Sequence, residues 1–231
     1  MRHDIVYVLR NDIDSTEVRY SIRSVVDNFP FNSLWIYGGK PNDIRPDHYV
    51  NIKQQGYNKW KRVTNTIRTI CLNDDITEDF WLFNDDFFIL QRVEQFPILH
   101  QGTLQERVDR IRKRHGGDSQ YSKQLSQTIK VLEAAGLDQI DYALHCPILI
   151  NRAKALKTID KFRGCPMFRS LYGNHHRIGG QYHQDCMIQN KTDLPADNSL
   201  FVSTSDRAYF YGAIGEYIRE RFNAASRYEL H

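Results

Sequence analysis

The first 40 residues contain a strand, a helix and a second strand, and this order constrains the fold more than any other feature of the chain. Residues 4–9 are rich in β-branched and aromatic side chains that do not alternate with polar ones, which is typical of a strand buried on both faces. Asp14 and Glu17 have the spacing of a helix start, and apolar residues follow with helical period up to Phe29. A second apolar strand is expected at 34–37. Together these elements form a βαβ unit, which implies a parallel sheet.

The alternation of strands and helices continues along the chain. We expect a helix at 59–70, strands at 80–83 and 87–90, a helical stretch at about 101–138, a strand at 142–150 interrupted by Pro147, and helices at 152–162 and 214–222. No internal repeat or long linker separates these elements. The sequence therefore predicts one α/β domain over residues 1–231, with a mostly parallel sheet flanked by helices and a helical insertion.

Composition excludes several classes of protein. With 41% hydrophobic residues the chain can fill a core, which excludes global disorder, and its net charge of +3 is too small to require a polyanionic partner. The longest apolar runs fall far short of the roughly 20 residues of a membrane span, and the start of the chain is typical of a strand and not of a signal peptide. The four cysteines form no closely spaced pair, so we expect free thiols and a soluble, cytoplasmic protein.

Two adjacent acids, Asp85 and Asp86, follow Asn84 between two predicted buried strands. At the end of a parallel strand, such a pair is costly in desolvation and mutual repulsion unless a cation or hydrogen-bond donors offset the cost. Mg²⁺ or Mn²⁺ bound to a diphosphate would do so, because these ions take oxygen ligands from one or two carboxylates and from phosphates. The alternative is a tight turn between the strands of a hairpin, where Asn and Asp make local hydrogen bonds.

Two further residues have side chains suited to a transfer reaction. His145 follows a predicted strand, and an imidazole can take a proton from an acceptor hydroxyl, although a packed core histidine is the structural alternative. Arg169 lies in an otherwise apolar segment, where it could bind a phosphate in bidentate fashion or form a structural ion pair. The histidines at 175–176 and the segment His183-Gln184-Asp185 could form a metal site, but they match no standard zinc spacing, and we interpret them as residues of a surface loop.

Basic residues cluster at 59–62, around Trp60, and at 107–114. A solvent-exposed helix face is the ordinary explanation of such a cluster. The functional explanation is binding of an anionic acceptor or of a nucleic-acid backbone.

Several segments are also distinctive as sequence. They are 4–11, Val18-Arg19-Tyr20-Ser21-Ile22-Arg23-Ser24 with Phe83-Asn84-Asp85-Asp86-Phe87-Phe88, His145-Cys146-Pro147 with Phe168-Arg169-Ser170, and Phe201-Val202-Ser203-Thr204-Ser205-Asp206 with the segment 217–229. In this order they resemble the four conserved regions of the Stealth family. These are sugar-phosphate transferases of microbial capsule synthesis, with relatives that include the animal lysosomal-enzyme phosphotransferase. In the first region Asn11 stands where the family usually has an acid.

The resemblance implies a core related to the GT-A glycosyltransferase fold, which is Rossmann-like. It also implies that a nucleotide diphosphate sugar is the donor and that Mg²⁺ or Mn²⁺ is the cofactor. Carried onto this chain, the catalytic residues are Asp86, His145, Arg169 and Asp206, the metal ligands are Asp85 and Asp86, and the donor-binding residues are Arg19, Arg23, Asn11 and Asn84.

The predicted activity is therefore metal-assisted transfer of a sugar 1-phosphate, or of the sugar itself, from the nucleotide sugar to an acceptor hydroxyl. The first reaction releases a nucleoside monophosphate and the second a nucleoside diphosphate. The acceptor would be a carbohydrate or another hydroxyl compound, and a phage-encoded GT-A enzyme acting on a modified DNA base or a surface glycan is an alternative. A second alternative is a non-catalytic nucleic-acid-binding accessory protein, whose binding would depend steeply on salt.

Overall fold

The computed structural model describes residues 2–10, 15–53, 56 and 58–230. The strands are β1 (Asp4–Leu9), β2 (Leu34–Gly38), β3 (His48–Val50), β4 (Asp79–Phe83), β5 (Phe87–Ile89), β6 (Leu99–His100), β7 (Ile148–Asn151), β8 (Gln181–Tyr182), β9 (Met187–Ile188) and β10 (Phe201–Thr204). The helices are α1 (Ser15–Asn28), α2 (Lys59–Cys71), α3 (Leu104–His115), α4 (Gln120–Ala134), α5 (Arg152–Lys161), α6 (Phe168–His175), α7 (Asp206–Tyr211) and α8 (Ala213–Arg221).

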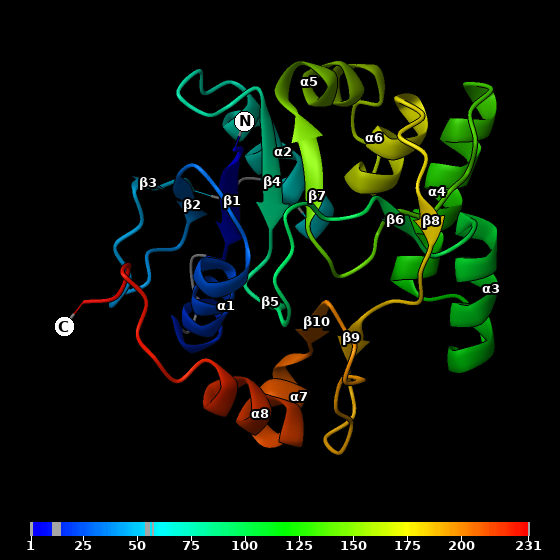
Figure 1. The fold of residues 1–231 in the computed structure, drawn as a ribbon. Coiled ribbons are helices and arrows are strands. Elements are labelled where there is room, and N and C mark those ends of the chain that lie inside the picture. Colours follow the sequence, from blue (N-terminus) through cyan, green and yellow to red (C-terminus); the bar gives the residue numbers. More distant parts are fainter. Residues whose placement is uncertain (1, 11–14, 54–55, 57, 231) are drawn as a thin grey trace.

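The largest sheet has the strand order β3-β2-β1-β4-β7 (Figure 1). The pairs formed by β1, β2, β3 and β4 are parallel, and β7 adds to β4 in the antiparallel direction. The predicted α/β class with a mostly parallel sheet is thus confirmed. β1 lies between β2 and β4, so the chain winds outward from β1 in both directions. In open sheets of this kind, ligands bind beyond the carboxyl ends of the strands at the point where the winding reverses.

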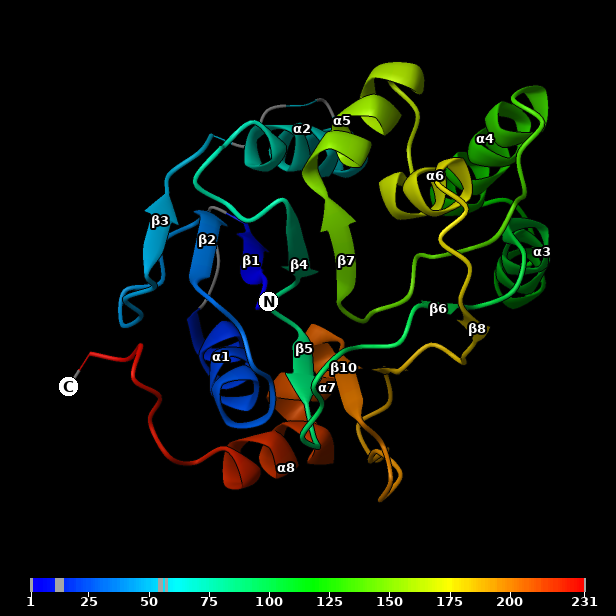
Figure 2. The same cartoon turned by 45° about the horizontal axis from the view of Figure 1, so that its top comes forward.

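Helices cover both faces of this sheet, with α1 on one side and α2 and α5 on the other (Figure 2). Alternate residues of β1 explain the arrangement, because Ile5 and Tyr7 pack with α1 while Val6 packs with α2. Both sets are fully buried. This is why the strand has no polar positions between its apolar ones.

A smaller sheet joins β5, β10 and β9, and it rests on α7 and α8 (Figure 1). β5 pairs antiparallel with β10, whereas β4 pairs with β1 and β7. The chain therefore leaves the large sheet at Asn84 and enters the small one at Phe87. A hairpin turn between β4 and β5 was the structural explanation for the paired acids, and the strand pairing contradicts it.

The helical stretch expected at about 101–138 contains α3 and α4, separated at Gly116, whose φ of 69° is left-handed. Both helices begin with a capping box, built by Thr103 with Glu106 in α3 and by Ser119 with Ser122 in α4. The description of this pair as an insertion into a single domain stays a prediction.

Two expectations about local structure differ from what is observed. The strand expected at 142–150 is limited to β7, because upstream backbone groups bond to side chains: Tyr142 N donates to Ser170 Oγ (3.1 Å), and Ala143 N donates to Asp141 Oδ1 (2.9 Å). The His175-His176 pair belongs to α6 and its C-terminus, where His176 Nε2 lies 2.9 Å from Thr158 Oγ1. These histidines are held by hydrogen bonds to α5 and do not lie in a surface loop.

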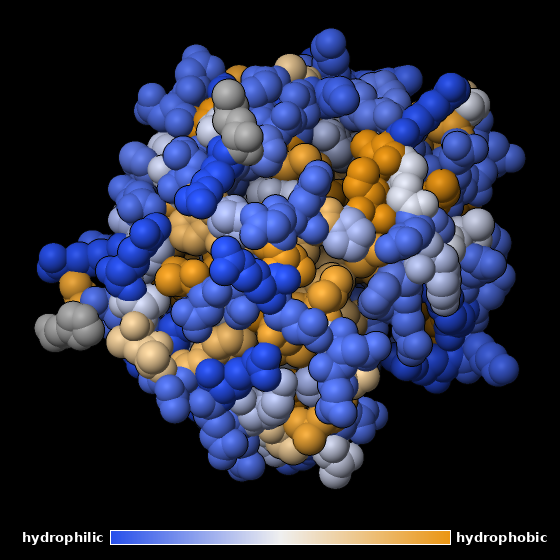
Figure 3. Space-filling view, in the orientation of Figure 1, coloured by the Kyte–Doolittle hydropathy of each residue, from blue (hydrophilic) through white to orange (hydrophobic). Residues whose placement is uncertain are grey.

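In the orientation of Figure 1 the surface is mostly hydrophilic, and apolar side chains show mainly near its middle (Figure 3). None of the helices in the described ranges is long and apolar enough to cross a membrane. The four cysteines are free thiols.

Candidate functional site

A cavity of about 500 Å³ opens beyond the carboxyl ends of β1 and β4, where the winding of the sheet reverses. Among the residues that line it are six of those predicted from the sequence: Asn84, Asp85, Asp86, His145, Arg169 and Asp206. They come from the β4–β5 connection, the segment before β7, helix α6 and the first residue of α7. Residues more than 120 positions apart thus lie around one cavity.

The acidic wall of the cavity is formed by Asp85, Asp86, Asp206 and Glu17. Burial raises the pKa of Asp85 to about 6, and repulsion from Asp86 contributes to the increase. Burial likewise raises the pKa of Asp86. Glu17 is 7% exposed, and burial raises its pKa to about 8 even though its Oε1 accepts a 2.6 Å hydrogen bond from Thr204 Oγ1. Burial therefore disfavours the charged forms of Asp85, Asp86 and Glu17.

Asp86 is held in place by β10. Ser203 Oγ donates to Asp86 Oδ2 (2.9 Å), and Thr204 N donates to the Asp86 carbonyl oxygen (3.3 Å). The other carboxylate oxygen, Oδ1, is buried and has no hydrogen-bond partner in the described part of the chain. A buried carboxylate oxygen without a donor is costly, so a ligand at this atom would relieve the cost.

The opposite charge comes from Arg169, Arg10, Lys59 and Arg62, which line the same cavity. Arg169 is clamped by the segment before β7, because its Nη1 donates to the carbonyl oxygens of Leu144 (2.8 Å) and Cys146 (2.6 Å). Burial lowers the pKa of Arg169, but a guanidinium stays protonated at neutral pH. Its Nη2 is buried without a hydrogen-bond partner among the described residues. This leaves a fixed donor for an anionic ligand.

His145 is oriented by Asp185, which lies outside the cavity lining. Asp185 Oδ1 accepts a hydrogen bond from His145 N (3.1 Å), and Asp185 Oδ2 lies 2.9 Å from His145 Nδ1. Arg107 Nη2 of α3 lies 3.9 Å from the same Oδ2. Burial opposes ionisation of Asp185, but the bonds to His145 and the charges of His145 and Arg107 outweigh it and lower the pKa of Asp185. A carboxylate at Nδ1 leaves Nε2 as the nitrogen that can accept a proton.

The predicted donor-binding residues Arg19 and Arg23 lie elsewhere. Arg19 forms an ion pair with Asp43, and Arg23 Nη2 lies 2.6 Å from Glu229 Oε2. Arg23 Nη1 also donates to the carbonyl oxygen of Phe222 (2.8 Å). The two arginines fasten the C-terminal segment to α1 and do not line the cavity. Of the other two residues in that set, Asn84 lines the cavity, and Asn11 is outside the described residues.

Several residues of the site are not predicted for it from the sequence, Lys59 and Arg62 among them. Glu17 is interpreted there only as a helix-start residue, and Arg10 only as part of the first conserved region. Asp185 is considered with His183 as a metal ligand, but its carboxylate contacts His145. A signal for Glu17 does exist, since it lies in the first turn of the helix that follows β1 and therefore near the carboxyl end of that strand.

The residues present fit a divalent cation that prefers oxygen ligands. No group of three or more His, Cys, Asp or Glu side chains in the described ranges is arranged to hold a metal ion by itself. Mg²⁺ and Mn²⁺ need fewer protein ligands, because one or two carboxylates suffice when substrate phosphates and water complete the shell. Asp86 Oδ1, which is buried without a hydrogen-bond partner among the described residues, and the adjacent Asp85 carboxylate are the oxygens that would serve as its ligands.

No protein-family model and no curated protein matches the chain. Solved structures do align with it, and two glycosyltransferases are among them. The apo form of the glycosyltransferase GlyE of Streptococcus pneumoniae TIGR4 is 10% identical with a TM-score of 0.44, and the alignment covers 97% of this chain and 61% of that one. Apo mouse xyloside xylosyltransferase 1 is 7% identical with a TM-score of 0.36, covering 99% and 96% respectively. The chain thus spans less than two thirds of GlyE. At these identities and TM-scores the alignments assign no activity to this chain, and the Stealth resemblance has no counterpart among family models.

Proposed function

We propose that the chain is a metal-assisted transferase that takes a sugar 1-phosphate, or the sugar, from a nucleotide diphosphate sugar and attaches it to an acceptor hydroxyl. The observation that carries the proposal is the content of one cavity: a buried acidic pair, a clamped arginine with an unused donor and a histidine oriented by a carboxylate. Each of these groups has a distinct use in such a transfer, and together they have no evident structural purpose.

The donor diphosphate would lie between the acidic and basic walls. Arg169 Nη2 can donate to a phosphoryl oxygen, and Arg10, Lys59 and Arg62 add positive charge around it. Asp85 and Asp86 would hold Mg²⁺ or Mn²⁺, which supplies charge neutralisation of the diphosphate. Because Arg169 is fixed by two carbonyl oxygens before the donor arrives, little reorganisation is needed as charge builds up on the phosphoryl oxygens.

The acceptor would approach from the side of His145. Its Nε2 takes the hydroxyl proton while the acceptor oxygen attacks, and the Asp185 carboxylate stabilises the imidazolium that forms. Attack at the sugar-bearing phosphorus breaks the bond to the bridging oxygen of the diphosphate and releases a nucleoside monophosphate. Attack at the anomeric carbon breaks the bond from that carbon to oxygen and releases a nucleoside diphosphate.

The products provide the test. The chain is incubated with UDP- and GDP-linked sugars and Mn²⁺, with water and simple glycosides as acceptors, and the released nucleotide is resolved by chromatography. Monophosphate supports phosphoglycosyl transfer, and diphosphate supports glycosyl transfer. If no nucleotide is released and no nucleotide sugar raises the melting temperature, the proposal is wrong. His145→Ala should abolish release, whereas the exposed His115→Ala, on α3, should leave it unchanged.

A further inference from the structure

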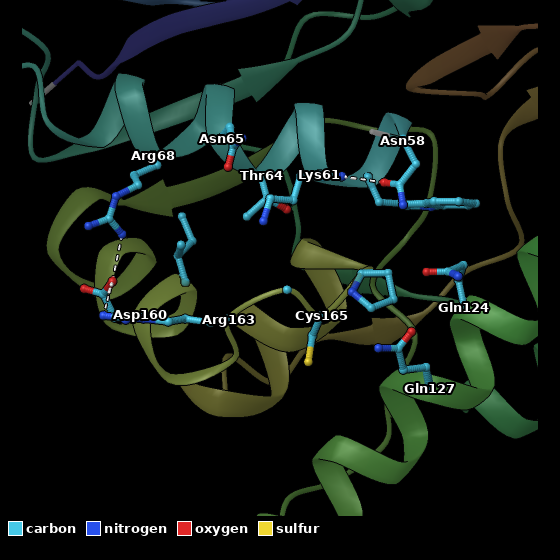
Figure 4. Close-up of a pocket in the computed structure, with 14 residues that line it drawn as sticks. Asn58, Lys61, Thr64, Asn65, Arg68, Gln124, Gln127, Asp160, Arg163 and Cys165 are labelled. Carbon is cyan, nitrogen blue, oxygen red and sulfur yellow. Dashed lines mark hydrogen bonds and ion pairs between the residues drawn. The ribbon is translucent and has the colours of Figure 1, made fainter. Parts of the chain in front are cut away.

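A second cavity lies on the other side of α2 from the candidate active site. It also has a volume of about 500 Å³, and it is walled by α2, α4 and the C-terminal end of α5 (Figure 4). We call this second cavity the α2 groove. Helix α2 lies between the two cavities, so Lys59 and Arg62 line the first cavity, and Lys61 and Arg68 line the α2 groove. Nothing in the transfer reaction uses this groove.

The walls of the α2 groove are polar. Four side-chain amides line it, two from the α2 side and two from α4: Asn58, Asn65, Gln124 and Gln127. Figure 4 shows Gln124 and Gln127 on α4 across the groove from Asn58, Lys61 and Thr64. Asn58 Oδ1 already accepts a 2.9 Å hydrogen bond from Lys61 N at the start of α2. The amides of the wall can still offer donors and acceptors to the edges of nucleobases and to sugar hydroxyls.

An aromatic ring completes the groove. The indole of Trp60 lines it and is only partly buried, and Lys59 Nζ lies 5.1 Å from the ring centroid. By contrast, Trp35 and Trp81 are each 4% exposed. A partly exposed aromatic ring beside cations is the arrangement on which single-stranded bases stack.

The groove carries a net positive charge. Three cations line it, Lys61, Arg68 and Arg163, together with one acid, Asp160. The neighbouring Lys59 and Arg62 line the first cavity instead. The one acid, Asp160, lies 2.8 Å from Arg68 and 3.8 Å from Arg163, so it is shared by two arginines of the groove. A surplus of positive charge therefore surrounds the cavity.

We propose that the α2 groove binds single-stranded nucleic acid. The lysine and arginines would contact phosphates, the amides would contact bases or sugars, and Trp60 would stack on a base. The partly exposed ring of Trp60 can stack on an unpaired base but not on a base inside a duplex, which favours a single strand. The inference goes beyond the proposed transfer reaction and does not depend on it, because it concerns a different cavity.

Binding is tested by fluorescence anisotropy with 5′-fluorescein-labelled dT20 over a range of salt concentrations. Lys61→Gln/Arg68→Gln/Arg163→Gln removes three charges from the groove. We expect it to weaken binding at least about tenfold and to reduce the slope of log K against log salt by about 2, since each phosphate that is no longer neutralised lowers the slope by roughly 0.7. The matched control, Arg112→Gln/Lys113→Gln/Arg114→Gln, removes three charges from exposed positions on α3 and should change binding less than twofold.

Trp60 provides a second readout. Unlabelled dT20 should quench the intrinsic fluorescence, and Trp60→Phe should abolish the quenching because the remaining tryptophans are buried. This measurement reports binding at the groove itself and needs no transfer activity.

Four outcomes would overturn the proposal. The first is that the groove variant and the α3 variant weaken dT20 binding equally, and the second is that dT20 does not quench the tryptophan fluorescence. The third is that the protein binds dT20 and its duplex with dA20 with equal affinity. The fourth is that polyaspartate displaces labelled dT20 as effectively as unlabelled dT20 does. The last would mean that the groove accepts acidic polymers in general. An inactive but dT20-binding protein would refute the transferase proposal alone, and an active protein without dT20 binding would refute this one alone.

Discussion

Asp185→Asn tests whether His145 is oriented for proton transfer. The substitution preserves shape, and the amide oxygen can still accept the hydrogen bond from His145 N. The other half of the side chain becomes an NH₂ group facing Nδ1, which in the native protein lies 2.9 Å from a carboxylate oxygen. An NH₂ group donates, so it favours the ring tautomer with its proton on Nε2, the nitrogen needed as the base.

The magnitude follows from the hydrogen bond that the substitution removes. A hydrogen bond to a charged group contributes about 1.5–3 kcal/mol, which corresponds to a shift of about 10- to 150-fold in the tautomer equilibrium. We therefore expect kcat to fall by about this factor. Because Asp185 does not line the cavity, KM for the nucleotide sugar should stay within about twofold. Loss of folded protein would also lower the apparent kcat without changing KM, so the ring tautomer of His145 in the folded protein is needed beside the kinetic constants to identify a positioning role.

Two assays are needed. Steady-state release of nucleotide gives kcat and KM, and ¹⁵N-detected ring correlations of His145 in the resting protein give the tautomer without any substrate. Asp118→Asn is the control, since Asp118 is exposed and pairs with Arg112 at 2.7 Å on the protein surface. An unchanged ring tautomer in Asp185→Asn would refute the positioning role. A changed tautomer with kcat within about threefold of the native value would show that His145 is not the base.

Four further substitutions test metal binding, binding of the nucleotide sugar and the stability of the folded protein separately. Mn²⁺ should raise the melting temperature of the native protein but not of Asp86→Asn, and EDTA should reverse the effect. Arg169→Lys should weaken binding of the nucleotide sugar at least about tenfold by calorimetry, because an ammonium cannot copy the clamped guanidinium. In EDTA, the free energy of unfolding should fall as pH rises from 4.5 to about 8, because the pKa of Glu17 is raised in the folded protein. Urea unfolding of Glu17→Gln should show a smaller fall than the native protein over this pH range. The exposed control Glu216→Gln should show the same fall as the native protein. Arg23→Met should lower the free energy of unfolding by about 3–5 kcal/mol without affecting turnover, since it breaks a buried ion pair distant from the cavity.

The central strands of the large sheet were predictable because their signal is local, whereas the edge strand β3 was not predicted. The apolar runs at β1, β2 and β4 are short and continuous, and the helix between β1 and β2 has clear periodicity, so the βαβ winding follows from sequence order. The partner of β5 was not predictable in this way. β10 lies more than 100 residues downstream, and nothing in the local pattern of either strand shows that they pair.

The candidate site shows the same division. Asp85 and Asp86 were identified because they interrupt an apolar run, which is a local anomaly with an electrostatic cost. Asp185 could not be assigned, because its role exists only through contact with His145, 40 residues away. Arg19 was placed with the donor through family resemblance, but its helix turns that side chain toward Asp43. Resemblance of a motif identifies the segment and leaves the direction of each side chain undetermined.

The separation of β4 and β5 into different sheets also bears on how the chain is made. The Phe-Phe-Ile strand β5 follows β4 directly, but its partner begins at Phe201, 112 residues after Ile89. At a synthesis rate of about 5–20 residues per second, an apolar strand with open edges waits about 6–22 seconds for its partner on the ribosome. Unpaired edges of this kind attract other chains. Production of the protein should therefore depend on chaperones that bind nascent chains, and truncation before β10 should yield aggregates in place of a smaller folded core.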